Sequence, residues 1–206
     1  MSARTRIGVL ALQGAFAAHI GVLKRLGADV REVRLPADLS ECDALVMPGG
    51  ESTTMSKLLE SSGLFDPIAT RIADGMPVFG TCAGMILLAR EVLDGRPDQR
   101  SFAALDIAVQ RNAYGRQIDS FEVDIAIRDI DASFHAVFIR APRITRFGSD
   151  VAVLAEHDGA PVLVRSNAVM AASFHPELSD DDRVHQMFLT LVNDVHAGRV
   201  ASPARR

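Results

Sequence analysis

The segment from Pro77 to Leu93 reads PVFGTCAGMILLAREVL. Its first four residues form a short apolar run, which is typical of a strand buried on both faces. The letters GTCAG, from Gly80 to Gly84, have the form G-x-C-x-G, and the apolar run after the cysteine predicts a helix that continues to Leu93. Small residues two positions before and after Cys82 allow the sharp turn of a nucleophile elbow. The alternative is a small buried hydrophobe in a tight turn, so the rest of the chain has to decide between the two.

Strands and helices alternate on the N-terminal side of this segment. Short apolar runs indicate strands, and apolar residues at helical spacing indicate helices. Strands are expected at residues 7–12, 30–35 and 44–47, and helices at 15–26, 52–62 and 67–73. Ser52 or Thr53 is expected to cap the helix that ends at 62. This alternation predicts a parallel sheet wrapped by helices.

The C-terminal half has a different pattern, because strand-like runs follow one another. They stand at residues 105–110, 121–127, 136–140, 151–157, 161–164 and 169–174. Asp158-Gly159 between two of them is a hairpin signal, and a closing helix is expected at 180–196. We therefore expect an α/β fold of three layers, in which a mostly parallel central sheet is flanked by helices and carries additional antiparallel strands. Residues 1–198 are expected to form a single domain and 199–206 a disordered tail.

The composition of the chain limits its function classes. With 206 residues, of which 48% are hydrophobic and 23% charged, it fits one globular domain. The formal net charge is −4 and no basic block stands out, so a nucleic-acid partner is not expected. No apolar run reaches the roughly 18–20 residues that span a bilayer, and no signal peptide is recognised. A cytoplasmic location without a membrane partner is expected, and the residues show no cluster that predicts a metal or another cofactor.

His175-Pro176-Glu177 follows the last strand-like run and supplies a candidate base. Pro176 keeps the preceding histidine out of helical conformation, and residues two apart in an extended segment lie on the same side. The carboxylate of Glu177 would then orient the imidazole of His175, which would take the proton of the Cys82 thiol. The alternative is a loop histidine beside a surface acid. The presence of the cysteine turn in the same chain favours the catalytic interpretation.

Pro48-Gly49-Gly50-Glu51-Ser52 follows the third strand and opens a helix. Glycines allow close approach of the backbone to a ligand, and amide groups here are suited to an oxyanion hole together with that of Ala83. The alternative is a plain glycine-rich turn before a capped helix.

The remaining cysteine and histidines have no comparable setting. Cys42 precedes a short strand, which favours a structural role. The other histidines are expected to be solvated or packing residues, whether in helices or near turns: His19, His135, His157, His185 and His196.

With these motifs identified, the chain resembles the triad, or class I, glutamine amidotransferases, whose fold is flavodoxin-like. It resembles more closely the glutaminase subunits of pyridoxal 5′-phosphate synthase. The stretches that carry the resemblance span nearly the whole chain in the family's order: LALQGAF at 10–16, PGGESTTM at 48–55, GTCAGMILLA at 80–89, RNAYGRQIDSFE at 111–122, FIRAP at 138–142 and SFHPEL at 173–178. The first, fourth and fifth are the more specific to this subunit. Departures from the pattern are confined to Met1 to Thr5, the polar loop Asp94 to Ser101 and the basic tail.

The resemblance implies a role for each matching residue. Cys82 would attack the side-chain amide of glutamine, with His175 as general acid and base and Glu177 as its orienting carboxylate. Gly50 and Ala83 would supply the oxyanion hole, and Gln13 would lie by that loop and sense the partner. The implied glutamine contacts are Gly50, Glu51, Ser52, Arg111, Ile139 and Arg140. By charge, Glu51 suits the α-ammonium of glutamine, and either Arg111 or Arg140 suits its α-carboxylate.

The resemblance also implies a partner. Ammonia would pass to a (β/α)8 synthase subunit that makes pyridoxal 5′-phosphate from ribose 5-phosphate and glyceraldehyde 3-phosphate, within a large hetero-oligomer. Pyridoxal phosphate is then a product of the complex and not a cofactor of this chain. Three alternatives stay open: a glutaminase subunit for another pathway, such as anthranilate or purine synthesis; a different cysteine hydrolase, such as a peptidase or a DJ-1-like protein; and a non-catalytic regulatory subunit on the same fold.

Overall fold

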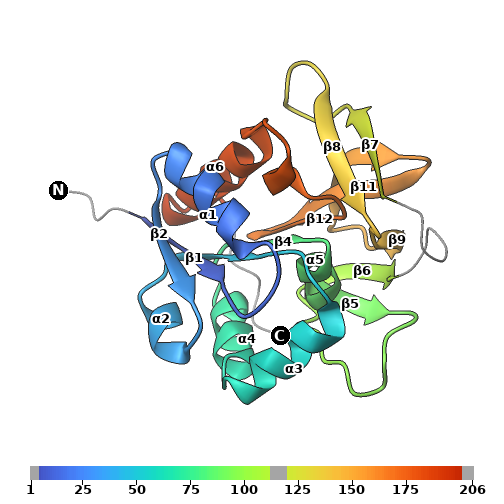
Figure 1. Ribbon diagram of the computed structural model, residues 1–206. Helices are drawn as coiled ribbons and strands as arrows, with labels where there is room; N and C mark the ends of the chain where they lie inside the picture. Colours follow the sequence, from blue (N-terminus) through green and yellow to red (C-terminus); the bar gives the residue numbers. More distant parts are fainter. Residues whose placement is uncertain (1–4, 112–119, 201–206) are drawn as a thin grey trace.

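The computed structural model describes residues 5–111 and 120–200, and a seven-stranded sheet lies at its centre (Figure 1). The strand order is β10-β11-β12-β4-β3-β1-β2, and the last five of these strands run parallel. β10 and β11 extend the sheet in antiparallel pairing. The strands are β1 (Arg6–Leu10), β2 (Asp29–Val33), β3 (Ala44–Met47), β4 (Val78–Thr81), β10 (Ala152–His157), β11 (Ala160–Ser166) and β12 (Val169–Ala172).

Helices cover both faces of this sheet, as strands buried on both sides require. On β3, Leu45 and Met47 point into one core and Ala44 and Val46 into the other. The first core lies beneath α2 (Pro36–Ser40), α3 (Ser52–Ser61), α4 (Phe65–Ala73) and α5 (Ala83–Leu88), and the second beneath α1 (Phe16–Arg25) and α6 (Arg183–His196). The chain therefore forms the three layers that the alternation of strands and helices predicts.

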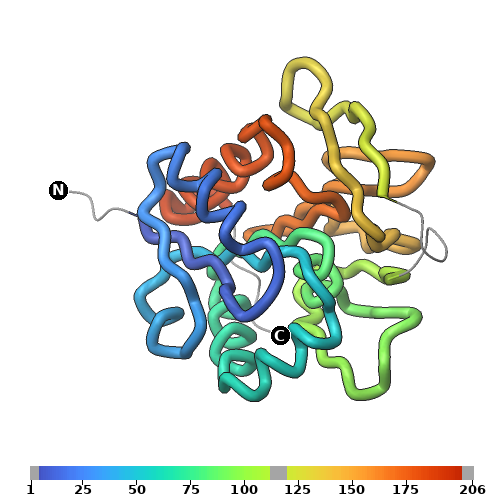
Figure 2. Tube along the Cα trace, viewed as in Figure 1, coloured from blue at the N-terminus to red at the C-terminus, as the bar shows by residue number. Residues whose placement is uncertain are grey.

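The first and last helices lie side by side, as the blue and red tubes of Figure 2 show. Arg25 at the end of α1 donates two hydrogen bonds to the carboxylate of Asp182, the residue before α6. Deeper in the same contact, His19 of α1 and His185 of α6 approach each other to 2.9 Å between ring nitrogens.

Two smaller sheets flank the central one. β5 (Ala89–Val92), β6 (Leu105–Gln110) and β9 (Arg143–Phe147) form one of them, and β7 (Ser120–Ile125) pairs with β8 (Phe134–Ile139) in the other. The β7–β8 pair closes over the second core, because Phe134 and Phe138 are buried there against Phe174.

The predicted fold class is confirmed, and so is the hairpin at Asp158-Gly159. These two residues have φ angles of 48° and 68°, and they join the antiparallel strands β10 and β11. Positive φ at both positions matches the right-handed twist of the strands that the turn connects.

Several predicted boundaries were wrong. The helix after the cysteine ends at Leu88, and Ala89 turns to an extended conformation so that β5 can pair with β6. The apolar run after Cys82 was predicted as one helix, but it includes both the buried helix α5 and the strand β5. The cap of α3 is Glu51 rather than Ser52 or Thr53, because its longer side chain reaches the amides of residues 53 and 54. The last helix begins at Arg183, and α2 and β9 were not predicted at all.

The single-domain assignment stays a prediction. Of the predicted tail, Arg199 pairs with Asp194 at 2.9 Å, and residues 201–206 lie outside the described residues. Among the residues that the structure places, no helix has the length and apolar character needed to cross a membrane.

Candidate active site

Cys82 sits on a strained turn between β4 and α5. Its φ of 49° and ψ of −104° lie in a region that residues other than glycine rarely adopt. A Cβ on Gly84 would stand 2.1 Å from the carbonyl oxygen of Met47, and a Cβ on Gly80 would stand 2.6 Å from the backbone of Gly84. The flanking glycines are therefore required by the close approach of β3, the turn and the helix, as the nucleophile elbow predicts.

His175 and Glu177 are brought together just beyond β12. His175 Nδ1 lies 2.7 Å from Glu177 Oε1, and both side chains are buried. The predicted convergence is present, but its geometry differs from the extended segment that was expected. Pro176 to Leu178 form a short 3₁₀ turn, η1, and this turn folds the carboxylate back onto the ring. The backbone amide of His175 donates to the carbonyl of Val137, which fixes the segment to β8.

The charges of this pair support each other. Burial alone would lower the pKa of His175, but interaction with the Cys82 side chain and the hydrogen bond with Glu177 raise it to about 10. Burial would raise the pKa of Glu177, but interactions with His19 and with His175 keep that pKa below its usual value. The carboxylate is therefore ionised and favours a protonated imidazole. Because Nδ1 is held by Glu177, the remaining ring nitrogen, Nε2, is the one available to the thiol.

The loop after β3 passes directly beside the cysteine and the histidine. A Cβ on Gly49 would stand 2.3 Å from His175 Cε1 and 3.3 Å from Cys82 Cβ. The carbonyl of the same glycine accepts a hydrogen bond from the amide of Ala15 at 3.3 Å. Gln13 Oε1 accepts from the amide of Glu51 at 3.1 Å, so the segment after β1 holds the loop in place. Gln13, the predicted sensor of a partner, therefore lies against the loop after β3.

A small cavity of about 150 Å³ opens at this loop. All six residues that the resemblance assigned to glutamine line it: Gly50, Glu51, Ser52, Arg111, Ile139 and Arg140. Cys82 and Ile86 complete the lining. Ala83, the other predicted donor of an oxyanion hole, begins α5 directly after the cysteine. Residues 112–119 of the RNAYGRQIDSFE stretch lie outside the described residues.

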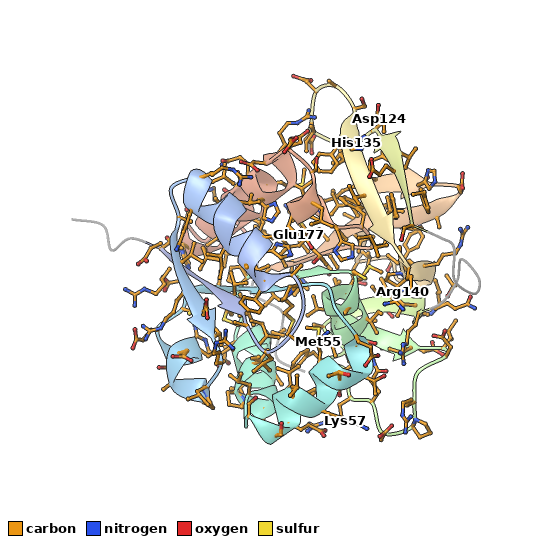
Figure 3. All side chains as sticks on the ribbon, viewed as in Figure 1. Met55, Lys57, Asp124, His135, Arg140 and Glu177 are labelled. Atoms are coloured by element: carbon orange, nitrogen blue, oxygen red, sulfur yellow. The ribbon has the colours of Figure 1, made fainter. Side chains whose placement is uncertain are left out.

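Glu51 and the two arginines have distinct surroundings. Glu51 accepts hydrogen bonds from the amides of residues 53 and 54 and from Arg111 Nη2 at 3.1 Å. Burial opposes its ionisation, but the bonds from Thr54 and Thr53 lower its pKa to about 2. Arg111 also donates to Gln99 Oε1 at 2.9 Å. Arg140, labelled in Figure 3, follows β8 directly, is exposed and has a φ of 43°. No ion pair within the described part of the chain engages it.

Three buried polar residues behind the triad were missed. His19 Nε2 lies 3.3 Å from Glu177 Oε2 and 3.2 Å from Thr81 Oγ1, and His185 reaches the other nitrogen of His19. His19 and His185 were expected to be solvated or packing residues. Both are fully buried; the two ring nitrogens of His19 and Nε2 of His185 have polar contacts, whereas His185 Nδ1 has no hydrogen-bond partner among the described residues. Both lie on apolar helix faces. There, a single sequence offers no signal that separates a histidine that only packs from one whose ring nitrogens contact other polar side chains.

Cys42, for which a structural role was predicted, is not among the residues that line the cavity. Cys42 is buried, its thiol donates to the carbonyl of Asp38 at 3.3 Å, and burial raises its pKa to about 11. Neither cysteine is in a disulfide. Within residues 5–111 and 120–200, no three histidine, cysteine or acidic side chains are grouped as metal ligands.

The parallel sheet, the cysteine turn after β4 and the His–Glu pair after β12 together define the class: an α/β glutamine amidotransferase. The chain belongs to the SNO glutamine amidotransferase family, whose model matches residues 9–194.

Relatives and solved structures agree with this assignment. The chain is 53% identical over 186 residues to a protein of Mycobacteroides abscessus, and 55% identical over 187 residues to one of Corynebacterium jeikeium. Both are named pyridoxal 5′-phosphate synthase subunit PdxT, and each match covers 90% of this chain and 96% of the relative. A crystal structure of a glutamine amidotransferase superposes with a TM-score of 0.86 at 49% identity, covering 91% of this chain and 98% of that one. A putative GMP synthase subunit from Thermoplasma acidophilum, at 15% identity and a TM-score of 0.69, shares the fold, with 97% and 99% coverage.

The close packing at Gly49 leads to a prediction. Gly49→Ala would place a methyl group against the His175 ring and force the ring away from Cys82. Displacements of about 1 Å cost on the order of a hundredfold in rate, so glutamate release from glutamine should fall by about that factor. The matched control is Gly21→Ala within α1, where the new Cβ is 3.9 Å from its nearest neighbour. That control should keep full activity, and wild-type activity in Gly49→Ala would contradict the packing argument.

Proposed function

We propose that this chain hydrolyses L-glutamine to L-glutamate and ammonia, and that it is the glutaminase subunit of a pyridoxal 5′-phosphate synthase. The observation that carries the proposal is the cavity at Cys82: the nucleophile and every residue assigned to glutamine line it, and the ion pair of His175 and Glu177 stands beside it. The names of relatives more than 50% identical over nine-tenths of the chain support the choice of pathway.

The chemistry follows from the positions of these groups. His175 Nε2 takes the proton of the Cys82 thiol, and the thiolate attacks the side-chain amide carbon of glutamine. The amides of Gly50 and Ala83 stabilise the oxyanion that forms on the amide oxygen. The imidazolium then gives its proton to the leaving nitrogen, so that ammonia departs and a glutamyl thioester remains. Water attacks this thioester with His175 again as base, which releases glutamate and restores the thiol.

Binding of the amino-acid end of glutamine uses the charged rim of the cavity. Glu51 stays ionised and faces the α-ammonium, because its cap and Arg111 hold it in one orientation. Arg111 is already committed to Glu51 and Gln99, whereas Arg140 is free of ion pairs among the described residues. We therefore assign the α-carboxylate to Arg140 and a supporting role to Arg111.

A partner is part of the proposal. Ammonia becomes protonated in neutral water and is then no nucleophile, so an enzyme that supplies it gains by passing it directly into a second active site. The receiving subunit would be a (β/α)8 synthase that uses ribose 5-phosphate and glyceraldehyde 3-phosphate. Gln13 is suited to report docking of that subunit, because it bonds the loop that carries Gly50. The cytoplasmic location stays a prediction.

A coupled assay with a candidate synthase subunit tests this function. The wild-type chain should support synthesis of pyridoxal 5′-phosphate from glutamine, and Cys82→Ala should abolish it because the nucleophile is lost. Added ammonium salt should restore synthesis in the mutant complex, since the synthase itself is intact. Cys42→Ala is the matched control and should keep activity. Synthesis from glutamine in Cys82→Ala, or glutaminase activity that feeds only a different synthase, would contradict the proposal.

The assignment of the two arginines is tested by glutamine kinetics. Arg140→Ala should raise KM by roughly ten- to a hundredfold with little change in kcat, because it removes a charge-assisted contact made equally before and during the reaction. Arg111→Ala should raise KM less, since it acts on substrate only through Glu51. Equal or reversed effects in the two variants would overturn the division of roles.

A further inference from the structure

A buried chain of polar side chains continues beyond the triad into the contact between α1 and α6. Glu177 Oε1 is taken by His175, and its second oxygen, Oε2, lies 3.3 Å from His19 Nε2. No described group makes a hydrogen bond to Oε2, although His19 Nε2 lies only 3.3 Å away, and both side chains are wholly enclosed. Figure 3 marks Glu177 close to α1, the helix that carries His19. A buried carboxylate oxygen without a donor costs free energy, so the nearby ring of His19 is suited to donate a hydrogen bond to it.

The contacts of His19 determine which of its nitrogens carries a proton. Its Nε2 faces two oxygens, Glu177 Oε2 and Thr81 Oγ1, whereas its Nδ1 faces His185 Nε2 at 2.9 Å. A proton on Nε2 bonds Thr81 Oγ1 and places an N–H 3.3 Å from Glu177 Oε2, within reach of a small rotation, and Nδ1 then accepts from the Nε2–H of His185. The opposite tautomer would set a nitrogen lone pair against the carboxylate. The favourable arrangement is therefore a relay of donors that runs from His185 to His19 to Glu177.

Both of these histidines are neutral in this arrangement. Burial lowers the pKa of His19 despite the attraction of Glu177, and burial together with the proximity of His19 lowers the pKa of His185 to about 3. His19 thus contributes an N–H to the carboxylate and adds no second positive charge. The full negative charge of Glu177 remains available to the imidazolium of His175.

We propose that His19 is a positioning residue: its Nε2–H fixes the Glu177 carboxylate so that Oε1 faces His175, and His185 holds His19 in the required tautomer. This role rests on the proposed glutaminase function. Thr81 lies next to Cys82 in sequence, so the same imidazole also contacts the strand that carries the nucleophile. His19 therefore lies against the triad carboxylate and the strand that precedes the nucleophile, from a helix that contributes no catalytic group.

The test uses the full chain with its synthase subunit and two matched variants. His19→Phe keeps a ring of similar shape without a donor, and His19→Gln places an N–H at about the position of Nε2. Loss of a hydrogen bond to a charged group should lower kcat of His19→Phe by roughly ten- to a hundredfold while KM for glutamine stays the same. His19→Gln should stay within about threefold of the wild type, because a donor is restored.

A second measurement separates positioning from folding. Titration of the His175 ring followed by NMR should show a lower pKa in His19→Phe than in the wild type, because a rotated carboxylate loses its bond to Nδ1. If His19→Phe does not fold, His185→Phe serves in its place. The His185 ring is hydrogen-bonded to His19 and, among the described residues, to neither His175 nor Glu177. Its replacement should lower kcat by about three- to tenfold, because it releases the tautomer of His19.

Three results would overturn the proposal: wild-type kcat in the phenylalanine variants, equal loss in His19→Gln and His19→Phe, or an unchanged titration of His175. A wild-type chain that releases no glutamate even with the synthase would count against the proposed function instead. The titration would then still decide the role of His19.

Discussion

The structure depends on one steric constraint: the backbones of β3, the cysteine turn and the first turn of α5 lie so close together that no side chain fits between them. A Cβ on Gly84 would meet the carbonyl oxygen of Met47 at 2.1 Å. This packing holds Cys82 at a φ of 49°, a conformation that only surrounding contacts sustain. The cysteine is presented at the carboxyl end of the sheet, where an open α/β sheet places its ligands.

The sheet order then brings together residues that are distant in sequence. β4 and β12 are parallel neighbours, and Thr81 pairs with Ala172, so Cys82 and His175 leave the sheet at the same edge. Glycine at position 49 lets the loop after β3 run beside both. Behind them, His19 and His185 connect the triad carboxylate to the two helices on one face. The catalytic groups thus lie at the carboxyl edge of the parallel strands, and their support comes from both ends of the chain.

The fold class, the cysteine turn and the pairing of His175 with Glu177 could be predicted from sequence because each depends on local patterns. Apolar runs marked the parallel strands, and glycines flanking Cys82 marked the elbow. Boundaries failed where local preference and pairing competed: the apolar run after Cys82 reads as one helix, but pairing with β6 turns Ala89 into a strand. The network around His19 could not be predicted, because a histidine on an apolar helix face has no sequence signal for its partner. The ion pair of Glu51 with Arg111 could not be predicted either, since it spans 60 positions.

The central claim is that Cys82 is the nucleophile of a glutamine-binding cavity. Mass spectrometry after incubation with 6-diazo-5-oxo-norleucine, an electrophilic analogue of glutamine, tests it most directly. A single adduct is expected on Cys82, prevented by excess glutamine, while the buried Cys42, whose pKa burial raises to about 11, stays unmodified. An adduct on Cys42, or glutamate release that continues with Cys82 unmodified, would contradict this account.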